Sequence, residues 1–169
     1  YERKALGRDS IFIYEDVTLA ALLTREDKAY LESLPEFCVV NYDGIKIMLS
    51  HFAIPDLLGV RTYFPKTAEE FQDHLRFIEK NDCRLGFSGH MHFEGVSICS
   101  HEVLKRNDFG KYRLLNSTQW VYGPCVARGR FNNGVMVLDT ATLEVEAIPL
   151  SKAMWINEAQ KLNALMLKV

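Results

Sequence analysis

Several features that would place the chain outside the ordinary globular class are missing from its sequence. The four cysteines are widely separated and form no Cys-x-x-Cys pair, so neither a zinc knuckle nor a disulfide framework is indicated. No apolar stretch reaches the roughly 18 residues that a membrane-spanning helix needs. Internal repeats and low-complexity segments are also lacking. We therefore expect free thiols and a reducing compartment, the cytoplasm.

An excess of charge of one sign is lacking as well. Twenty basic side chains stand against 22 acidic ones, which gives a formal net charge of -2. This balance provides no general attraction to nucleic acid or to a membrane surface, so we expect neither as a partner. With 169 residues, of which 48% are hydrophobic, the chain has the size and composition of one globular domain with a buried core.

The first half of the chain predicts a helix, a hairpin and a second helix. The first 25 residues carry only a weak strand or loop signal, and residues 25–33 have the pattern of a short helix. The strand-like runs 37–42 and 45–50 are joined by Asp-Gly, a dipeptide typical of a tight hairpin turn. Thr67 and Glu70 form a capping box before an amphipathic helix over residues 67–80, whose apolar positions are Phe71, Leu75 and Ile78.

The second half predicts mainly strands. Strand-like segments are "CRLGFS", "GVSICS", "KYRLLNS", "GVMVLDT" and "LEVEAIPL". A final helix is predicted from about Lys152, with Trp155 on its apolar face. Strands mixed with helices that cover them indicate a layered α/β or α+β domain.

Three of the five histidines follow predicted strands. His51 ends the second strand of the hairpin, and His90 and His92 come just after a short buried strand and Gly89. A lone histidine at a strand end is more often a hydrogen-bonded surface residue. Gly-His-x-His after a buried strand, with another strand-end histidine about forty residues earlier, is more specific. Because imidazole is a good ligand for zinc, manganese, iron or nickel, we predict half of a metal site here.

Two of these segments resemble a known family. "GFSGHMH" resembles the GHxH motif of the calcineurin-like metallophosphoesterases, and "IKIMLSHFAIPD" is similar to the strand and histidine that precede it there. "YRLLNSTQWVYGP" is similar in place and pattern to the family's strand followed by Asn-Pro-Gly-Ser, so that the resemblance covers about residues 31–150. It implies part of a four-layer α/β/β/α sandwich with two mixed β-sheets and metal ligands on loops at strand ends.

The resemblance also implies an activity and a set of site residues. His51 and His90 would bind one ion of a dinuclear centre and His92 the other, while Asn116 would lie on the substrate side. The two ions would be divalent transition metals (Mn, Fe, Zn or Ni). The implied reaction is hydrolysis of a phosphomonoester or phosphodiester, with a phosphorylated small molecule or a nucleotide as substrate. Phe52 stands where the family has glycine, and Ser117-Thr118 where Pro-Gly is common.

Three further motifs of the family do not occur in the 169 residues: Asp-x-His, Gly-Asp-x-x-Asp and Gly-Asn-His-Asp/Glu. In the family they provide the remaining ligands, the bridging aspartate and the general acid. We therefore expect residues 1–169 to be a single domain that forms the C-terminal portion of a metallophosphoesterase domain, with the general acid in a missing N-terminal portion. By itself the chain should be inactive or nearly so, with a sheet edge and a core face unpaired.

Two other functions remain open. The alternative to an enzyme is a non-catalytic phosphoesterase-like scaffold that binds proteins, either through the apolar loop 52–64 or through the final helix. The plainer interpretation is that the loop roofs or packs on the site and that the helix covers a sheet face. A third possibility is a mononuclear metallohydrolase of another family, with the three histidines and an open position for water.

The remaining polar and aromatic candidates have plain interpretations. His74 is predicted to be a packing or boundary residue, and His101 to be solvated. Arg61, in the loop after His51, is the basic residue best placed to meet phosphate, ahead of Arg128, Arg130, Lys105 and Arg106. Three aromatic residues either stack on a nucleobase or fill a loop core: Tyr63, Trp120 and Tyr122.

Overall fold

The computed structural model describes residues 23–59, 64–126 and 133–150. The weak strand signal near the N-terminus and the helix predicted from about Lys152 lie outside these residues. None of the helices in the described ranges is long and apolar enough to cross a membrane.

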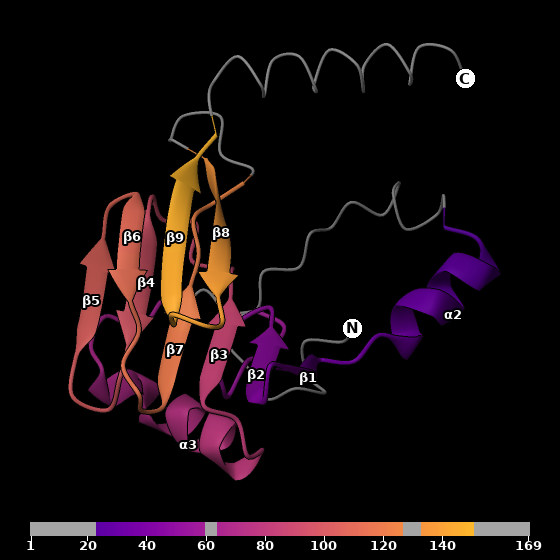
Figure 1. Ribbon diagram of the computed structural model, residues 1–169. Helices are drawn as coiled ribbons and strands as arrows, with labels where there is room; N and C mark the ends of the chain where they lie inside the picture. Colours follow the sequence, from indigo (N-terminus) through magenta and orange to yellow (C-terminus); the bar gives the residue numbers. More distant parts are fainter. Residues whose placement is uncertain (1–22, 60–63, 127–132, 151–169) are drawn as a thin grey trace.

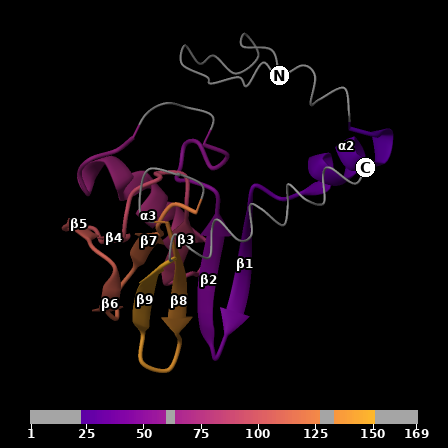
Figure 2. The same cartoon turned by 90° about the horizontal axis from the view of Figure 1, so that it is seen from above.

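The first described helix has the predicted bounds. α2 (Arg25–Ser33) begins after Thr24, whose side-chain oxygen accepts the backbone N–H of Asp27 at 3.1 Å. The Asp27 carboxylate in turn accepts the backbone N–H of Thr24 at 2.8 Å, which completes a capping box. Every residue of α2 is exposed, and the helix lies to one side of the sheets, beyond β1 (Figures 1 and 2).

The predicted hairpin is confirmed. β1 (Phe37–Tyr42) pairs antiparallel with β2 (Ile45–Ser50) over their whole length. Asp43 and Gly44 between them have φ angles of 51° and 78°. Positive φ at both positions of a two-residue loop is what the right-handed twist of the two strands requires.

The hairpin belongs to a six-stranded mixed sheet. Its order is β1-β2-β3-β7-β4-β5, in which β2, β3 and β7 run parallel to one another. The four further strands are β3 (Leu85–Ser88), β4 (Val96–Cys99), β5 (Leu104–Asn107) and β7 (Gln119–Tyr122). Because β2, β3 and β7 are parallel, their carboxyl ends lie at the same edge of the sheet.

A second sheet packs on one face of the first. Its order is β6-β9-β8, and its strands are β6 (Gly110–Arg113), β8 (Gly134–Asp139) and β9 (Glu144–Pro149). All of its pairs are antiparallel, so only one of the two sheets is mixed, whereas two mixed sheets were expected. The α/β class with two sheets is confirmed, and the described residues supply three layers of the expected four.

The third layer is the amphipathic helix. A 3-10 turn, η2 (Glu69–Phe71), leads into α3 (Gln72–Lys80). The Glu70 carboxylate accepts the backbone N–H of Thr67 at 3.0 Å, so the glutamate half of the predicted capping box is present. The three predicted apolar positions are buried. α3 covers the face of the large sheet opposite β8 and β9 (Figure 2).

Two apolar clusters hold these layers together, and β7 contributes to both. Trp120 and Tyr122 belong to the cluster between the large sheet and α3, while Val121 belongs to the cluster between the two sheets. Side chains of a strand alternate between its faces, and here both faces are buried. Trp120 and Tyr122 are therefore core residues, whereas Tyr63 lies outside the described residues.

One apolar face is only partly covered. A groove of about 440 Å³ lies between the hairpin and β8, and most of its lining is apolar, including Val40, Leu49, Phe87, Met136 and Leu138. Within the described residues β1 and β8 are both edge strands. An additional strand pairing with either edge would cover this face.

Candidate functional site

Two of the predicted metal ligands lie against each other at the carboxyl ends of neighbouring strands. His51 directly follows β2, and His90 lies two residues beyond β3. The backbone N–H of Gly89 donates to the carbonyl of His51 at 3.2 Å and so extends the pairing of the two strands. As a result, His51 Nε2 and His90 Nδ1 are 3.1 Å apart.

The turn that carries His90 has an unusual backbone. His90 and His92 both have positive φ angles, 66° and 52°. This left-handed conformation is uncommon in residues other than glycine, although histidine adopts it more readily than most. Backbone outliers of this kind concentrate at functional sites, where the surrounding structure holds them in place.

The loop after His51 packs on the histidine pair. The Phe52 ring lies 4.4 Å from the His90 ring, and Phe64 stacks on His90 at 5.6 Å with an interplanar angle of 21°. A Cβ atom on Gly59 would lie 2.6 Å from His90 Cε1 and 2.8 Å from His51 Cδ2. Glycine is therefore required for this close approach. The described part of the loop packs on the two histidines, which agrees with the plainer interpretation.

The electrostatic surroundings favour neutral His51. Burial of part of its ring lowers the pKa of His51 below its ordinary value, and the charge of His92 lowers it further. The carboxylate of Asp56 acts in the opposite direction on the pKa of His51. A neutral imidazole is the form that binds a metal ion, because the protonated ring has no free lone pair.

Asp56 is a residue that the sequence patterns did not single out. Its side chain is 4% exposed, in the loop that follows His51. An acidic residue after a proline ordinarily indicates a solvated turn, so the pattern gave no reason to expect burial. Its nearness to His51 follows from the folding of the loop back onto β2 and β3.

The separation of His51 and His90 fits two ligands of one ion. His51 Nε2 and His90 Nδ1 would both be able to hold such an ion, because imidazole nitrogen is a ligand of zinc and other transition metals. His92 is exposed and near enough for its charge to act on His51. Within the described ranges no group of three or more His, Cys, Asp or Glu side chains is arranged to hold a metal. Two imidazoles would be only part of a coordination shell.

The structure does not bring Asn116 to the histidines. Arg84 Nη1 donates to Asn116 Oδ1 at 2.6 Å. Arg84 directly precedes β3, whereas His90 follows its other end, so Asn116 and His90 lie at opposite ends of that strand. Arg61 lies outside the described residues, as do Arg128 and Arg130. Lys105 and Arg106 lie on the edge strand β5.

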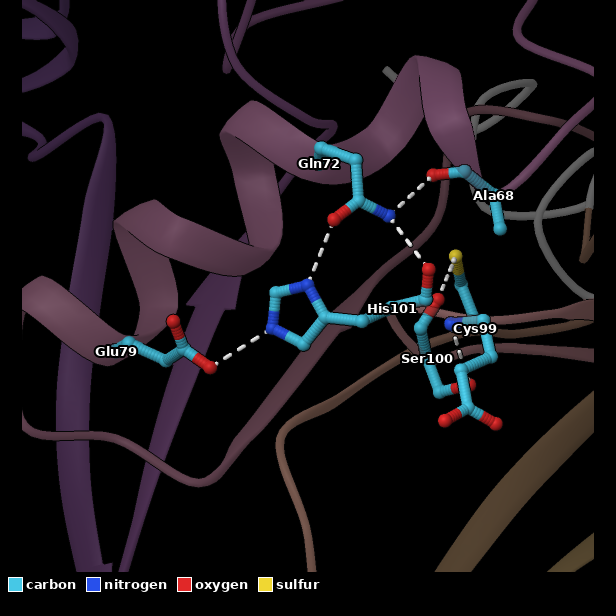
Figure 3. Close-up of polar contacts among 7 residues, drawn as sticks. Ala68, Gln72, Glu79, Cys99, Ser100 and His101 are labelled. Carbon is cyan, nitrogen blue, oxygen red and sulfur yellow. Dashed lines mark hydrogen bonds and ion pairs between the residues drawn. The ribbon is translucent and has the colours of Figure 1, made fainter.

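The two remaining histidines, His74 and His101, contribute to packing and to contacts between elements of the fold. His74 is fully buried on α3, in agreement with its predicted packing role. His101 is exposed, as expected, but its ring also has two partners: its Nδ1 lies 2.7 Å from Gln72 Oε1, and its Nε2 lies 2.8 Å from Glu79 Oε1 (Figure 3). These contacts bind the loop between β4 and β5 to α3, and they are invisible in sequence because the partners are 22 and 29 residues away.

Comparisons with known proteins define the fold. A metallophosphoesterase from Sphaerobacter thermophilus matches 90% of this chain with a TM-score of 0.57 and 14% identity. The hypothetical protein PH1004 from Pyrococcus horikoshii OT3 matches 83% with a TM-score of 0.50 and 13% identity. The chain spans 66% of the first structure and 50% of the second. No protein-family model and no curated protein matches the sequence. The chain thus has a metallophosphoesterase-like fold.

Proposed function

We propose that the chain is part of a metal-dependent phosphoester hydrolase with a dinuclear centre. His51 and His90 hold one ion, and His92 is a ligand of the other. The observation that carries the proposal is the His51–His90 pair, with 3.1 Å between the facing nitrogens at the carboxyl ends of two parallel strands. Ligand sites of α/β proteins lie at such strand ends.

The residues of the chain have separate tasks in this proposal. His51 offers a neutral nitrogen at physiological pH, because burial and the charge of His92 lower its pKa. Phe52 and Phe64 both pack against the His90 ring and restrict its orientation. When bound, two divalent transition ions (Mn, Fe, Zn or Ni) would supply positive charge for phosphate oxygens and a hydroxide at neutral pH.

The proposal assigns the remaining ligands and the general acid to another segment. Two facing histidines do not complete a coordination shell, so carboxylates must come from elsewhere. The apolar groove between the hairpin and β8 would receive a further strand of that segment. The chain alone should then be inactive or nearly so. The proposed substrate is a phosphorylated small molecule or a nucleotide, and the proposed compartment is the cytoplasm.

A second candidate is a phosphoesterase-like scaffold that binds another protein. The same groove favours it, since Tyr42 and Leu49 in its lining are 59% and 38% exposed. Apolar side chains gathered in this way are typical of an interaction surface.

The test is metal content and turnover of the natural polypeptide that contains this sequence. Elemental analysis should find about two transition ions per chain, with hydrolysis of p-nitrophenyl phosphate or its bis ester. His90→Ala should lose both, whereas His101→Ala, a matched histidine far from the site, should keep both. Absence of bound metal together with absence of turnover after addition of manganese would refute the enzyme and leave the scaffold.

A further inference from the structure

The loop that follows His51 is a compact turn closed by its own backbone. Phe52 N donates to the carbonyl of Leu57 at 2.9 Å, and Asp56 N donates to that of Ala53 at 2.8 Å. The described part of the loop that directly follows His51 extends to Gly59, whose N–H donates to the carbonyl of Asp56 at 3.0 Å. These backbone hydrogen bonds hold Phe52 and Gly59 in fixed positions relative to each other.

One amide of this loop donates to a side chain of another layer. The backbone N–H of Ile54 donates to His74 Nδ1 at 3.2 Å. His74 lies on α3, 0% exposed, with its ring edge-to-face with Trp120 at 5.1 Å. Burial lowers the pKa of His74 to about 4, so the ring is neutral and Nδ1 is free to accept while Nε2 carries the proton.

If packing were the only role of residue 74, an apolar side chain would stabilise the fold more than histidine does. His74 Nε2 is buried and has no hydrogen-bond partner within the described part of the chain. A buried polar atom without a partner destabilises the folded state, and an apolar side chain of similar size would avoid this cost. The feature that an apolar side chain lacks is the acceptor that faces Ile54.

The far end of the same loop touches the histidine pair. Gly59 lies so near that a Cβ atom there would clash with both His51 and His90. A shift of the loop toward the pair would therefore displace both rings. We infer that His74 is a positioning residue: by accepting the Ile54 N–H it fixes the loop that holds His51 and His90 in register as a pair of ligands.

Two substitutions separate this role from simple packing. His74→Leu fills the core without an acceptor, whereas His74→Asn places Oδ1 near the position of Nδ1 and keeps one. The first readout is exchange of the Ile54 amide by NMR, and the second is the Zn²⁺ affinity of the natural polypeptide by calorimetry. A hydrogen bond contributes about 1 kcal/mol, so His74→Leu should speed exchange and weaken Zn²⁺ binding each about fivefold. His74→Asn should restore most of both.

The inference rests on the proposed function only where Zn²⁺ affinity is measured. If wild type binds no Zn²⁺, the proposed function fails, while amide exchange and the imidazole nitrogen shifts of His51 and His90 still test the positioning role. Unchanged exchange and unchanged shifts in His74→Leu would overturn it. Should His74→Leu not fold, Gly59→Ala disturbs the other end of the loop without touching the α3 core. Because its Cβ atom would clash with both rings, unchanged imidazole shifts in this variant would refute the contact between the loop and the histidine pair, and the inference with it.

Discussion

Acidification is expected to destabilise the fold through His74. The pKa of this buried histidine is about 4 in the folded chain, against about 6.5 in an unfolded chain. Between these values the unfolded chain binds a proton that the folded chain excludes, so stability is complete above pH 6.5 and falls as the pH drops toward 4. The shift corresponds to a loss of about 2 kcal/mol between pH 7 and pH 5, and of about 3 kcal/mol when the fall is complete.

Urea unfolding at pH 7, 6 and 5 measures this loss. The comparison is between wild type and His74→Leu, which lacks the titrating group and keeps the core filled. The pKa of His51 is lowered as well, but His51 is present in both proteins and its contribution cancels. Wild type should lose about 2 kcal/mol more than the variant over this range, roughly 1 M in urea midpoint. Parallel pH dependences of the two proteins would refute the assignment of a neutral, buried His74.

Three further substitutions test the packing. Gly86→Val should destabilise by about 1–3 kcal/mol in thermal unfolding, because a Cβ atom there would lie 2.6 Å from Ile78 Cδ1 on α3. Val121→Ala should cost about 2 kcal/mol in urea unfolding, since this side chain is fully buried between the sheets; a cost below about 0.5 kcal/mol would contradict the burial of β7. His101→Ala should cost about 1 kcal/mol and speed amide exchange in α3.

Local chemistry explains the elements that the sequence predicted well. The helix at Arg25–Ser33 begins at a capping box, and the hairpin turns at Asp43-Gly44. Such signals act over three or four residues and depend little on the rest of the chain. The burial of Phe71, Leu75 and Ile78 followed from helical spacing in the same way.

The strands β5 and β7 were not predicted as separate elements. β5 is "LKRN", an edge strand with mostly polar residues, and its pairing with β4 decides its conformation. β7 follows the polar run Asn116-Ser117-Thr118, which resembles a loop, yet it lies between β3 and β4 in the centre of the sheet. A strand of four residues has too few positions to show a period, so only its neighbours define it.

The sequence by itself determined that His51 and His90 each follow a strand, because strand and turn signals are local. The tertiary structure decided the rest of the site. Parallel pairing of β2 with β3 brings His51 Nε2 within 3.1 Å of His90 Nδ1, although the two residues are 39 positions apart. The same sheet places Asn116 at the other end of β3, and α3 brings His74 under the loop. These distances depend on contacts between remote segments, which no short pattern contains.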